Sequence, residues 1–233
     1  MDKPRRSWTV TPHDELVQHE QNLWSVEGMV PGAPFRRRMC IARRSDGSLL
    51  FFHAVPLEDK VLEQVKALGK PAYLVVGHHQ HAIDAHPFAE RLGLKIFGPR
   101  RSEAALRQRC DFGGALEDVP ADPAVSVESL PGSKLAEAVI VVKSGDRRSV
   151  LFCDAIQNNP PEKTKTIFRL LGFAGGPKSP FLFRLLFLQD KRAMREALER
   201  FAALPGLKRI IPCHGDVVEN GAAEALKAAA AAL

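Results

Sequence analysis

The sequence predicts an α+β protein of one domain, a four-layer αββα sandwich in which two facing sheets carry helices on their outer sides. The length of 233 residues suits one large domain. Strand patterns dominate the first part of each half of the chain, and helical patterns follow them. A strand–helix–strand unit, whose strands pair in parallel, comes directly after an antiparallel meander. Together these observations favour two sheets packed face to face.

The chain divides into an N-terminal arm, residues 1–20, and a single domain, residues 21–233. The arm is polar and contains Pro4 and Pro12. Hydrophobic residues make up 45% of the chain. A domain of this size buries roughly 70–75% of the surface of its unfolded chain, and this share of apolar residues is sufficient for such a core.

The first half opens with three short strands, at residues 23–27, 37–42 and 49–53. The last two are joined by Asp46-Gly47, which is a strong hairpin signal. Apolar residues at helical spacing then predict a helix over 58–68, and Gly69 ends it. The apolar run 72–76 predicts a buried strand. Four further elements follow: a helix to about residue 92, a strand at 95–97, a helix at 101–109 and a loop at 110–124.

The second half repeats this order, with strands expected at residues 125–129, 136–142, 149–153 and 208–212. An amphipathic helix is predicted over 190–204, where an apolar stripe lies opposite exposed Arg–Glu pairs. An alanine-rich helix over 219–233 ends the chain. Residues 154–188 are irregular and rich in Phe, Leu and Gly. We expect this segment to wall a pocket, which favours a small-molecule substrate with a hydrophobic portion.

The composition excludes several classes of protein. No apolar run approaches the ~20 residues needed to span a bilayer, and the charged N-terminus lacks the apolar core of a signal peptide. We therefore expect a cytoplasmic protein with no membrane partner. Cys40, Cys110, Cys153 and Cys213 are far apart, which predicts reduced, buried thiols and neither a disulfide framework nor a thiolate zinc site. No pattern in the sequence indicates an oligomeric state.

The net charge is +6, and arginines cluster at residues 36–38, 43–44, 100–101 and 147–148. A basic surface attracts anionic partners without specifying them. Because no aromatic residues alternate with these arginines to stack on bases, we interpret the clusters as solvated faces. Nucleic-acid binding is the minor alternative.

Four histidines lie within nine residues directly after the expected buried strand: His78, His79, His81 and His86. In α/β sheets this end of a strand is where ligands bind. Asp84 lies among them, and imidazoles with a carboxylate suit zinc, iron or manganese. His79 and His81 are two residues apart, so on an extended turn their side chains can converge on one ion. A solvated polar loop is the alternative interpretation.

Two more candidate ligands follow strand ends. Asp154 comes after the strand at 149–153, and His214 comes after the strand at 208–212. Parallel or mixed strands would bring both residues to the same rim as the histidine loop. A carboxylate at such a point can bridge two ions, and a single histidine can complete a coordination shell.

This order of features resembles the metallo-β-lactamase superfamily. The resemblance rests on the histidine loop after the strand–helix–strand unit, the aspartate ending a later strand, and I-I-P-C-H-G near the C-terminus. The stretches N-L-W-S-V-E-G and G-S-L-L-F-F-H-A-V-P-L are also similar, the second to a divergent bacterial branch. The resemblance covers residues 20–233 in layout. It implies a metallo-β-lactamase-like fold that binds one or two divalent metal ions, with zinc ahead of iron and manganese.

The chain departs from the family motif H-x-H-x-D-H. His79 and His81 match its first two histidines, whereas Ile83 stands in place of its aspartate and Asp84 in place of its third histidine. Ser133 stands where a histidine commonly follows Pro-Gly in this family.

The resemblance implies two altered ion sites. One would keep His79, His81 and Asp154, and the other would keep His214 and Asp154 with Asp84 as a new ligand. If the loop bulges by one residue, Asp84 takes the role of the family aspartate and His86 follows as a ligand. His53 and Asp216 are candidate partners of the ligands.

We expect a metal-dependent hydrolase, in which Asp84 or Asp154 is the catalytic carboxylate that holds the nucleophile or accepts a proton. A non-catalytic binding module that has lost its ions is the alternative, and Ile83 and Ser133 favour it. Nucleic-acid processing, suggested by the arginine clusters, ranks last.

Overall fold

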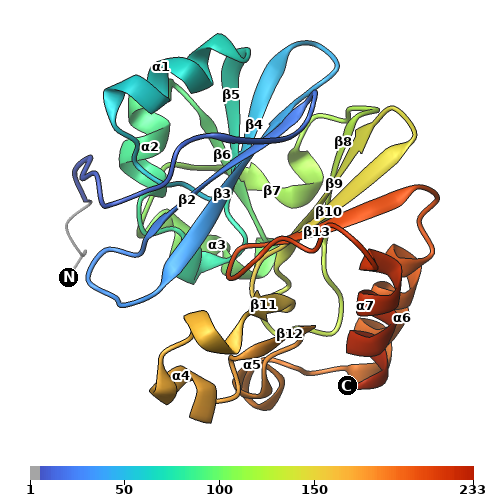
Figure 1. Cartoon of the computed structure of the whole chain (residues 1–233). Coiled ribbons are helices and arrows are strands. Elements are labelled where there is room, and N and C mark those ends of the chain that lie inside the picture. Colours follow the sequence, from blue (N-terminus) through green and yellow to red (C-terminus); the bar gives the residue numbers. More distant parts are fainter. Residues whose placement is uncertain (1–5) are drawn as a thin grey trace.

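Two sheets face each other across the middle of the molecule in the computed structural model, which describes residues 6–233 (Figure 1). The larger sheet has seven strands in sequence order: β1 (Val17–Glu20), β2 (Leu23–Met29), β3 (Arg36–Arg43), β4 (Ser48–Phe52), β5 (Lys70–Val75), β6 (Lys95–Gly98) and β7 (Phe112–Ala115). Strands β1 to β4 pair antiparallel and β4 to β7 pair parallel. Helices connect the parallel strands, as parallel pairing requires a crossover.

The smaller sheet has the order β13 (Leu207–Pro212), β10 (Arg147–Phe152), β9 (Ala138–Ser144) and β8 (Val125–Ser129). Strands β8, β9 and β10 form an antiparallel meander, and β13 pairs parallel with β10. Consequently, the carboxyl ends of β10 and β13 lie side by side. A third, two-stranded sheet pairs β11 (Gln157–Asn159) with β12 (Gly175–Lys178).

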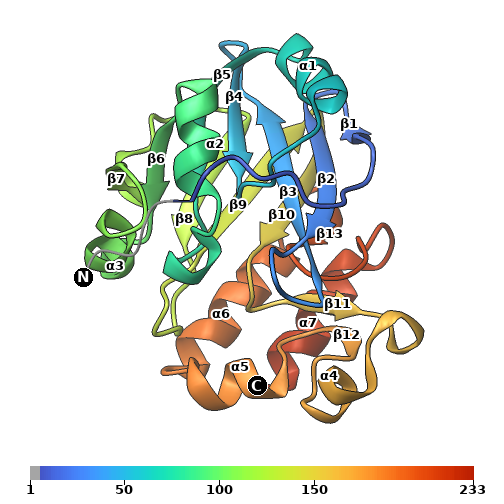
Figure 2. The same ribbon diagram turned by 90° about the vertical axis from the view of Figure 1, so that its left-hand side faces the viewer.

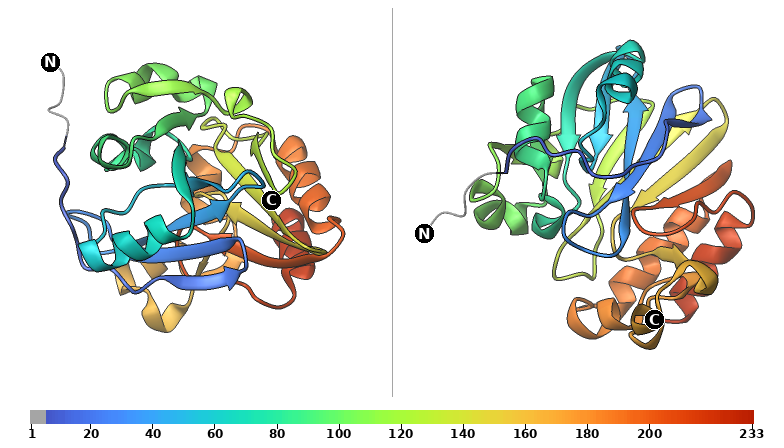
Figure 3. Two further views of the ribbon diagram at one scale, coloured as in Figure 1. Left: turned by 90° about the horizontal axis from the view of Figure 1, so that it is seen from above. Right: turned by 60° about the vertical axis from the view of Figure 1, so that its left-hand side comes forward.

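Helices cover the outer face of each sheet (Figures 1 and 2). Helices α1 (Asp59–Ala67), α2 (Ala85–Leu92) and α3 (Glu103–Arg107) lie on the seven-stranded sheet, and α6 (Lys191–Ala202) and α7 (Ala222–Ala231) lie on the four-stranded sheet. Seen from above, the strands lie between these two groups (Figure 3). The remaining helices are short: η1 (His79–His81), η2 (Arg100–Ser102), η3 (Leu116–Asp118), η4 (Pro161–Lys163), α4 (Thr166–Leu170) and α5 (Phe181–Leu186).

Alternation along the strands divides the interior into three apolar layers. In β4, Leu49 and Phe51 pack against the helices, whereas Leu50 and Phe52 point toward the other sheet, because neighbouring side chains of a strand face opposite sides. The central layer between the sheets includes Ile140 of β9. This arrangement confirms the predicted αββα sandwich.

Three of the segments expected to lack regular structure contain strands. Strand β1 lies within the expected arm, β7 within the expected loop 110–124, and β11 and β12 within the irregular segment 154–188. Each of them is short and has few apolar residues, so its stability comes from pairing with a neighbouring strand, which a local pattern does not reveal.

The arginine clusters are only partly solvated. Arg37, Arg38 and Arg44 are buried, so the expectation of solvated faces is wrong for them. Arg38 donates to the carboxylate of Glu27 and to the carbonyl oxygen of Pro212, which ties β3 to the other sheet. These arginines satisfy internal acceptors and cannot contribute to a surface that attracts anions.

All four cysteines are buried and none forms a disulfide, as predicted. Cys40 and Cys153 lie between the sheets, and Cys110 lies under the helices of the seven-stranded sheet. Within residues 6–233, no helix combines the length and the apolar character needed to cross a bilayer.

Candidate metal centre

The candidate site lies where four strands end at one edge of the sandwich. Strand β5 leads into His78 and η1, β10 leads into Asp154, β13 leads into His214, and β4 leads into His53. Strands β4 and β5 are parallel in one sheet, as are β10 and β13 in the other, so the carboxyl ends within each pair meet at one edge.

Three imidazoles surround the carboxylate of Asp154. The Nε2 atom of His78 lies 2.9 Å from Oδ2 of Asp154, and Nε2 of His81 lies 3.2 Å from the same oxygen. The Nε2 atom of His214 lies 3.4 Å from Oδ1. The side chain of Asp154 is 21% exposed, so this group of four can be reached from solvent.

The short helix η1 explains why His78 and His81 face the same way. His78 is the residue before η1, and its Nδ1 accepts a hydrogen bond from the backbone N–H of Gln80 at 3.3 Å. In a 3₁₀ turn, side chains three residues apart lie on the same side. His81 therefore returns to the side of His78, and His79 points away from it.

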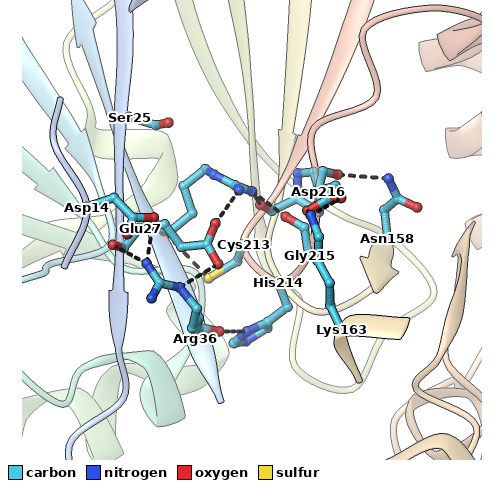
Figure 4. A network of polar contacts seen from close by, with 12 residues as sticks. Asp14, Ser25, Glu27, Arg36, Asn158, Lys163, Cys213, His214, Gly215 and Asp216 are labelled. Carbon is cyan, nitrogen blue, oxygen red and sulfur yellow. Dashed lines mark hydrogen bonds and ion pairs between the residues drawn. The ribbon is translucent and has the colours of Figure 1, made fainter. Parts of the chain in front are cut away.

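The loop after β13 is anchored by polar contacts with neighbouring segments, including one between His214 and Arg36 (Figure 4). The Nδ1 atom of His214 donates to the carbonyl oxygen of Arg36 at 2.6 Å, and its Nε2 is directed at Asp154. Metal-binding histidines are commonly oriented by such a bond from the other ring nitrogen. Asp216 secures the same loop, since its backbone N–H donates to Asn158 and its carboxylate pairs with Lys163.

The pKa shifts in this group favour the metal-binding forms of Asp154 and His81 at neutral pH, whereas the shift of His214 favours its protonated form. Burial lowers the pKa of His81 to about 4, although the charge of Asp154 opposes this shift. Burial alone would raise the pKa of the Asp154 carboxyl, but the electrostatic interaction with His81 and hydrogen bonds with the three imidazoles hold it well below its ordinary value. For His214, burial lowers the pKa, and the hydrogen bond and charge of Asp154 outweigh burial and raise it. Asp154 is therefore ionised and His81 is neutral near pH 7.

A second, fully buried group lies behind His81. The ring of His53 is 4.6 Å from that of His81 between centroids, and Sγ of Cys213 is 3.7 Å from Nδ1 of His81. Both ring nitrogens of His53 are buried without a hydrogen-bond partner in the described part of the chain, and its backbone has φ of 67°. Such strain in a residue other than glycine is typical of functional sites. A side chain at Gly77 would come within 2.6 Å of the His53 ring, so only glycine leaves room for it.

Glu137 supports Asp154 from below. Its Oε2 accepts a hydrogen bond from the backbone N–H of Asp154 at 2.7 Å. Burial first, and then the charge of Asp154, raise the pKa of Glu137 to about 7. Neither Glu137, which directly precedes β9, nor Cys213, which directly follows β13, was expected in the site, because no motif of the sequence singles them out.

Of the residues expected in the site, the structure brings His81, Asp154 and His214 together, with His78 beside them. His79 lies outside the group, with Nδ1 at 3.5 Å from Oγ of Ser102 and its carbonyl oxygen bonded to Arg109.

Asp84 also lies outside, in a buried ion pair with Arg37. The remaining candidates have other neighbours. His86 lies 3.5 Å from Asp111, and the hydroxyl of Ser133 accepts a bond from the backbone N–H of Leu135.

No family model and no curated protein matches the sequence. Solved structures do match. The chain superposes on DIM-1 metallo-β-lactamase, in crystals exposed to ceftazidime, with a TM-score of 0.67, covering 96% of this chain and 99% of that one at 12% identity. The chain has the metallo-β-lactamase fold.

Two other metallo-β-lactamases are similar. The enzyme from Hirschia baltica gives a TM-score of 0.58 at 13% identity, with 93% and 97% of the two chains covered. The mono-zinc form of FIM-1 from Pseudomonas aeruginosa gives 0.55 at 13% identity, with 96% of each chain covered. Among residues 6–233 of this chain, two groups of side chains could hold a metal ion: His78, His81, Cys153 and Asp154, and His53, His81 and Cys213.

Proposed function

We propose that the protein is a metal-dependent hydrolase whose ion is held by His78, His81, Asp154 and His214. The observation that carries this proposal is one carboxylate with three imidazole Nε2 atoms within 3.4 Å of it, supplied by three separate loops. Three nitrogens and one oxygen suit zinc, and also iron or manganese. His79 and Asp84, which the sequence favoured as ligands, are not part of the proposed set.

The donor set fits an ion on chemical grounds. His81 belongs to the proposed set, and burial lowers its pKa to about 4, so it is neutral near pH 7, the form that binds metal; the same holds for His53, which lies behind it outside the set. The ionised carboxylate of Asp154 supplies negative charge that an ion would neutralise. Both ring nitrogens of His53, directly behind His81, lack a hydrogen-bond partner in the described chain, so they are further nitrogen atoms that could bind a metal ion.

A bound divalent ion would supply Lewis acidity, which lowers the pKa of water toward roughly 7 and polarises a substrate oxygen. The chain contributes orientation: Glu137 fixes the backbone of Asp154, and Arg36 fixes the ring of His214. Asp154 is the carboxylate that can accept a proton from water here. Asp84 cannot do so, because its carboxylate forms a buried ion pair with Arg37.

The apolar wall of the site favours a substrate with a hydrophobic portion. The ring of Phe35 lies 5.8 Å from that of His214 and 6.0 Å from that of Phe168, between centroids. Phe168 belongs to α4, which lies in the Phe- and Leu-rich segment after β11. A substrate that reaches His214 would pass these two rings.

Metal analysis of purified variants tests the proposal. After loading with zinc, manganese or iron and removal of excess ion, we expect the wild-type protein to retain at least one equivalent. His81→Ala and Asp154→Ala should lose it, and His79→Ala, the matched control in the same loop, should retain it. A wild-type protein that retains no ion, or a His79→Ala protein that loses as much as His81→Ala, would contradict the assignment.

The buried pair of Asp84 with Arg37 supports a second candidate, a binding module without catalysis. A carboxylate held in this way can neither bind an ion nor move a proton. Hydrolysis of a panel of chromogenic esters, phosphodiesters and lactams by the zinc-loaded protein separates the candidates. An enzyme should show turnover that Asp154→Asn abolishes, whereas a binding module should show none.

A further inference from the structure

An unusual number of large apolar side chains is exposed at one end of the molecule. Six of them belong to α4 and α5 or directly follow α4: Ile167, Leu170, Leu171, Phe181, Leu185 and Leu186. Leu170 is 79% exposed and Leu185 is 63% exposed. We call this set the apolar end face. Apolar clusters of this kind commonly mark a binding surface for another molecule or a membrane.

The apolar end face is continuous. Helices α4 and α5 lie at the same end of the molecule, away from the paired sheets (Figures 1 and 2). The end of α4 contacts the start of α5, since a side chain at Gly172 would come within 2.8 Å of the Phe181 Cβ. Residues three and four apart share one side of a helix, which groups Ile167 with Leu170 and Phe181 with Leu185.

Positive charge borders this face. Residues 161–191 contain six lysines and arginines and only two acidic residues, so they carry four of the six net positive charges of the chain. Lys165 and Arg169 lie one turn apart at α4 and both are exposed. Within residues 6–233, neither of them forms an ion pair with a carboxylate, and the same holds for Lys178. The cations beside the exposed leucines are therefore available to an anionic partner.

We propose that the apolar end face docks on the surface of an anionic lipid bilayer. The leucines and Phe181 would enter the boundary between headgroups and acyl chains, while Lys165 and Arg169 contact the headgroups. A second copy of the chain is disfavoured because a twofold interface places the same surface against itself, which would bring Lys165 and Arg169 of both copies together. An anionic bilayer satisfies both the apolar and the positive parts of the surface.

This proposal departs from the expectation of no membrane partner, which rested on the lack of a spanning segment. Surface docking requires only an apolar face with neighbouring cations. It also connects with the candidate centre, since Phe168 of α4 touches Phe35, which lies against His214. Docking would therefore place the path by which a substrate reaches His214, past Phe168 and Phe35, next to the lipid surface. The docking itself does not depend on a bound ion or on hydrolysis.

Co-sedimentation of the full chain with vesicles tests the proposal. The probes are vesicles of phosphatidylcholine alone and of phosphatidylcholine with phosphatidylglycerol in about a 2:1 ratio. We expect the wild-type protein to bind the anionic vesicles and to remain in solution with the neutral ones. The double variant Leu170→Glu, Leu185→Glu should lower the partition coefficient at least about tenfold, and Lys165→Gln, Arg169→Gln should lower it several-fold.

Matched controls change the same residue types elsewhere. Val10→Glu, Val17→Glu replaces apolar residues that are 40% and 50% exposed in and before β1, and Lys70→Gln, Lys143→Gln removes two exposed lysines from other strands. Both controls should bind like the wild type, and all four variants should keep its unfolding midpoint. Absence of vesicle binding, equal binding to neutral vesicles, or undiminished binding of the leucine variant would overturn the proposal. A concentration-dependent dimer without vesicle binding would overturn it in favour of a second copy.

Discussion

Among single side chains, Asp84 and Arg37 show how a charge in the loop of the candidate site can serve the fold. Both side chains are 1% exposed and pair with each other. The Nη2 atom of Arg37 makes this contact, and its Nε and Nη1 atoms have no hydrogen-bond partner in the described chain. The guanidinium therefore depends on Asp84 for its main stabilising contact, which keeps this carboxylate away from the imidazoles.

We predict that Asp84→Asn lowers the free energy of unfolding by about 3–5 kcal/mol, because it leaves a buried cation without its counter-charge. Asp59→Asn is the matched control. Asp59 pairs with Arg91 at the surface, where its side chain is 85% exposed, and the loss there should be within about 1 kcal/mol. Urea unfolding followed by circular dichroism measures both values. Equal effects of the two substitutions would contradict the structural role of Asp84.

His19 makes stability depend on pH away from the candidate centre. Its Nε2 lies 2.8 Å from the hydroxyl of Ser25. Burial lowers its pKa from 6.5 to about 4, although the charge of Glu219 opposes the shift. Between these values the unfolded chain binds a proton that the folded protein does not, so stability falls as the pH decreases from about 7 to about 4.

We predict that His19→Gln reduces this acid-induced loss of stability by roughly 2–3 kcal/mol. Urea unfolding at a series of pH values, with metal removed by chelation, measures the slope for both proteins. An unchanged slope in the variant would show that His19 does not resist protonation in the folded state.

The sequence predicted that histidines and an aspartate form the site, but it predicted only some of the individual residues correctly. Asp154 and His214 directly follow strands with clear apolar patterns, so their positions at the rim follow from the order of elements. The histidine loop was interpreted as extended, which favours residues two apart, His79 and His81. The chain instead forms a 3₁₀ turn, which groups His78 with His81. The pairing of Asp84 with Arg37 joins residues 47 positions apart and has no local signal.

Among the elements, the loop after β13 depends on a single glycine. Gly215 has φ of 90°, and a Cβ there would lie 1.9 Å from the carbonyl oxygen of Asn158. Asn158 belongs to β11, which pairs with Gly215 through an isolated bridge. This close approach holds His214 beside Asp154.

We predict that Gly215→Ala destabilises the protein by about 3 kcal/mol or more, because it adds a backbone clash to an unfavourable conformation. Gly47→Ala separates the cost of the clash from the cost of the conformation. Gly47 has φ of 81°, and apart from Gly47 and its two chain neighbours no atom of residues 6–233 lies within 4 Å of the position that a Cβ would take there, so only the conformational cost of about 1–2 kcal/mol applies. Thermal unfolding of both variants provides the comparison, and similar losses would argue against the contact with Asn158.

Elements with strong periodicity were predicted well, including the strands near 23–29, 36–43 and 125–129 and the helix α6. Their own side chains form the apolar layers, so the pattern and the packing coincide. Strands β1, β7, β11 and β12 were missed because their pairing partners, not their composition, stabilise them.

For the whole molecule, the candidate centre joins the two halves of the chain. His78 and His81 follow the seven-stranded sheet, whereas Asp154 and His214 follow the four-stranded sheet. An ion held by all four would bind the folded protein and not the unfolded chain, in which these residues are far apart.

We predict that zinc at about 100 times its dissociation constant stabilises the protein by about 2.7 kcal/mol, which corresponds to a rise of roughly 5–10 °C in Tm. A chelator should reverse the rise, and Asp154→Ala should abolish it. Differential scanning calorimetry provides the measurement. A rise of the same size in Asp154→Ala would place the stabilising ion elsewhere.

Because the cysteines are buried, their reaction with alkylating reagents can report local opening of the folded protein. Burial raises the pKa of Cys40 to about 12 and keeps the Cys153 thiol protonated as well, whereas the thiolate is the form that attacks alkylating reagents. Alkylation of these thiols therefore requires local opening of the structure around them. Cys110 would report separation of the helices from their sheet, and Cys40 and Cys153 would report parting of the two sheets. The order in which these positions become alkylated would reveal which layer of the sandwich opens first.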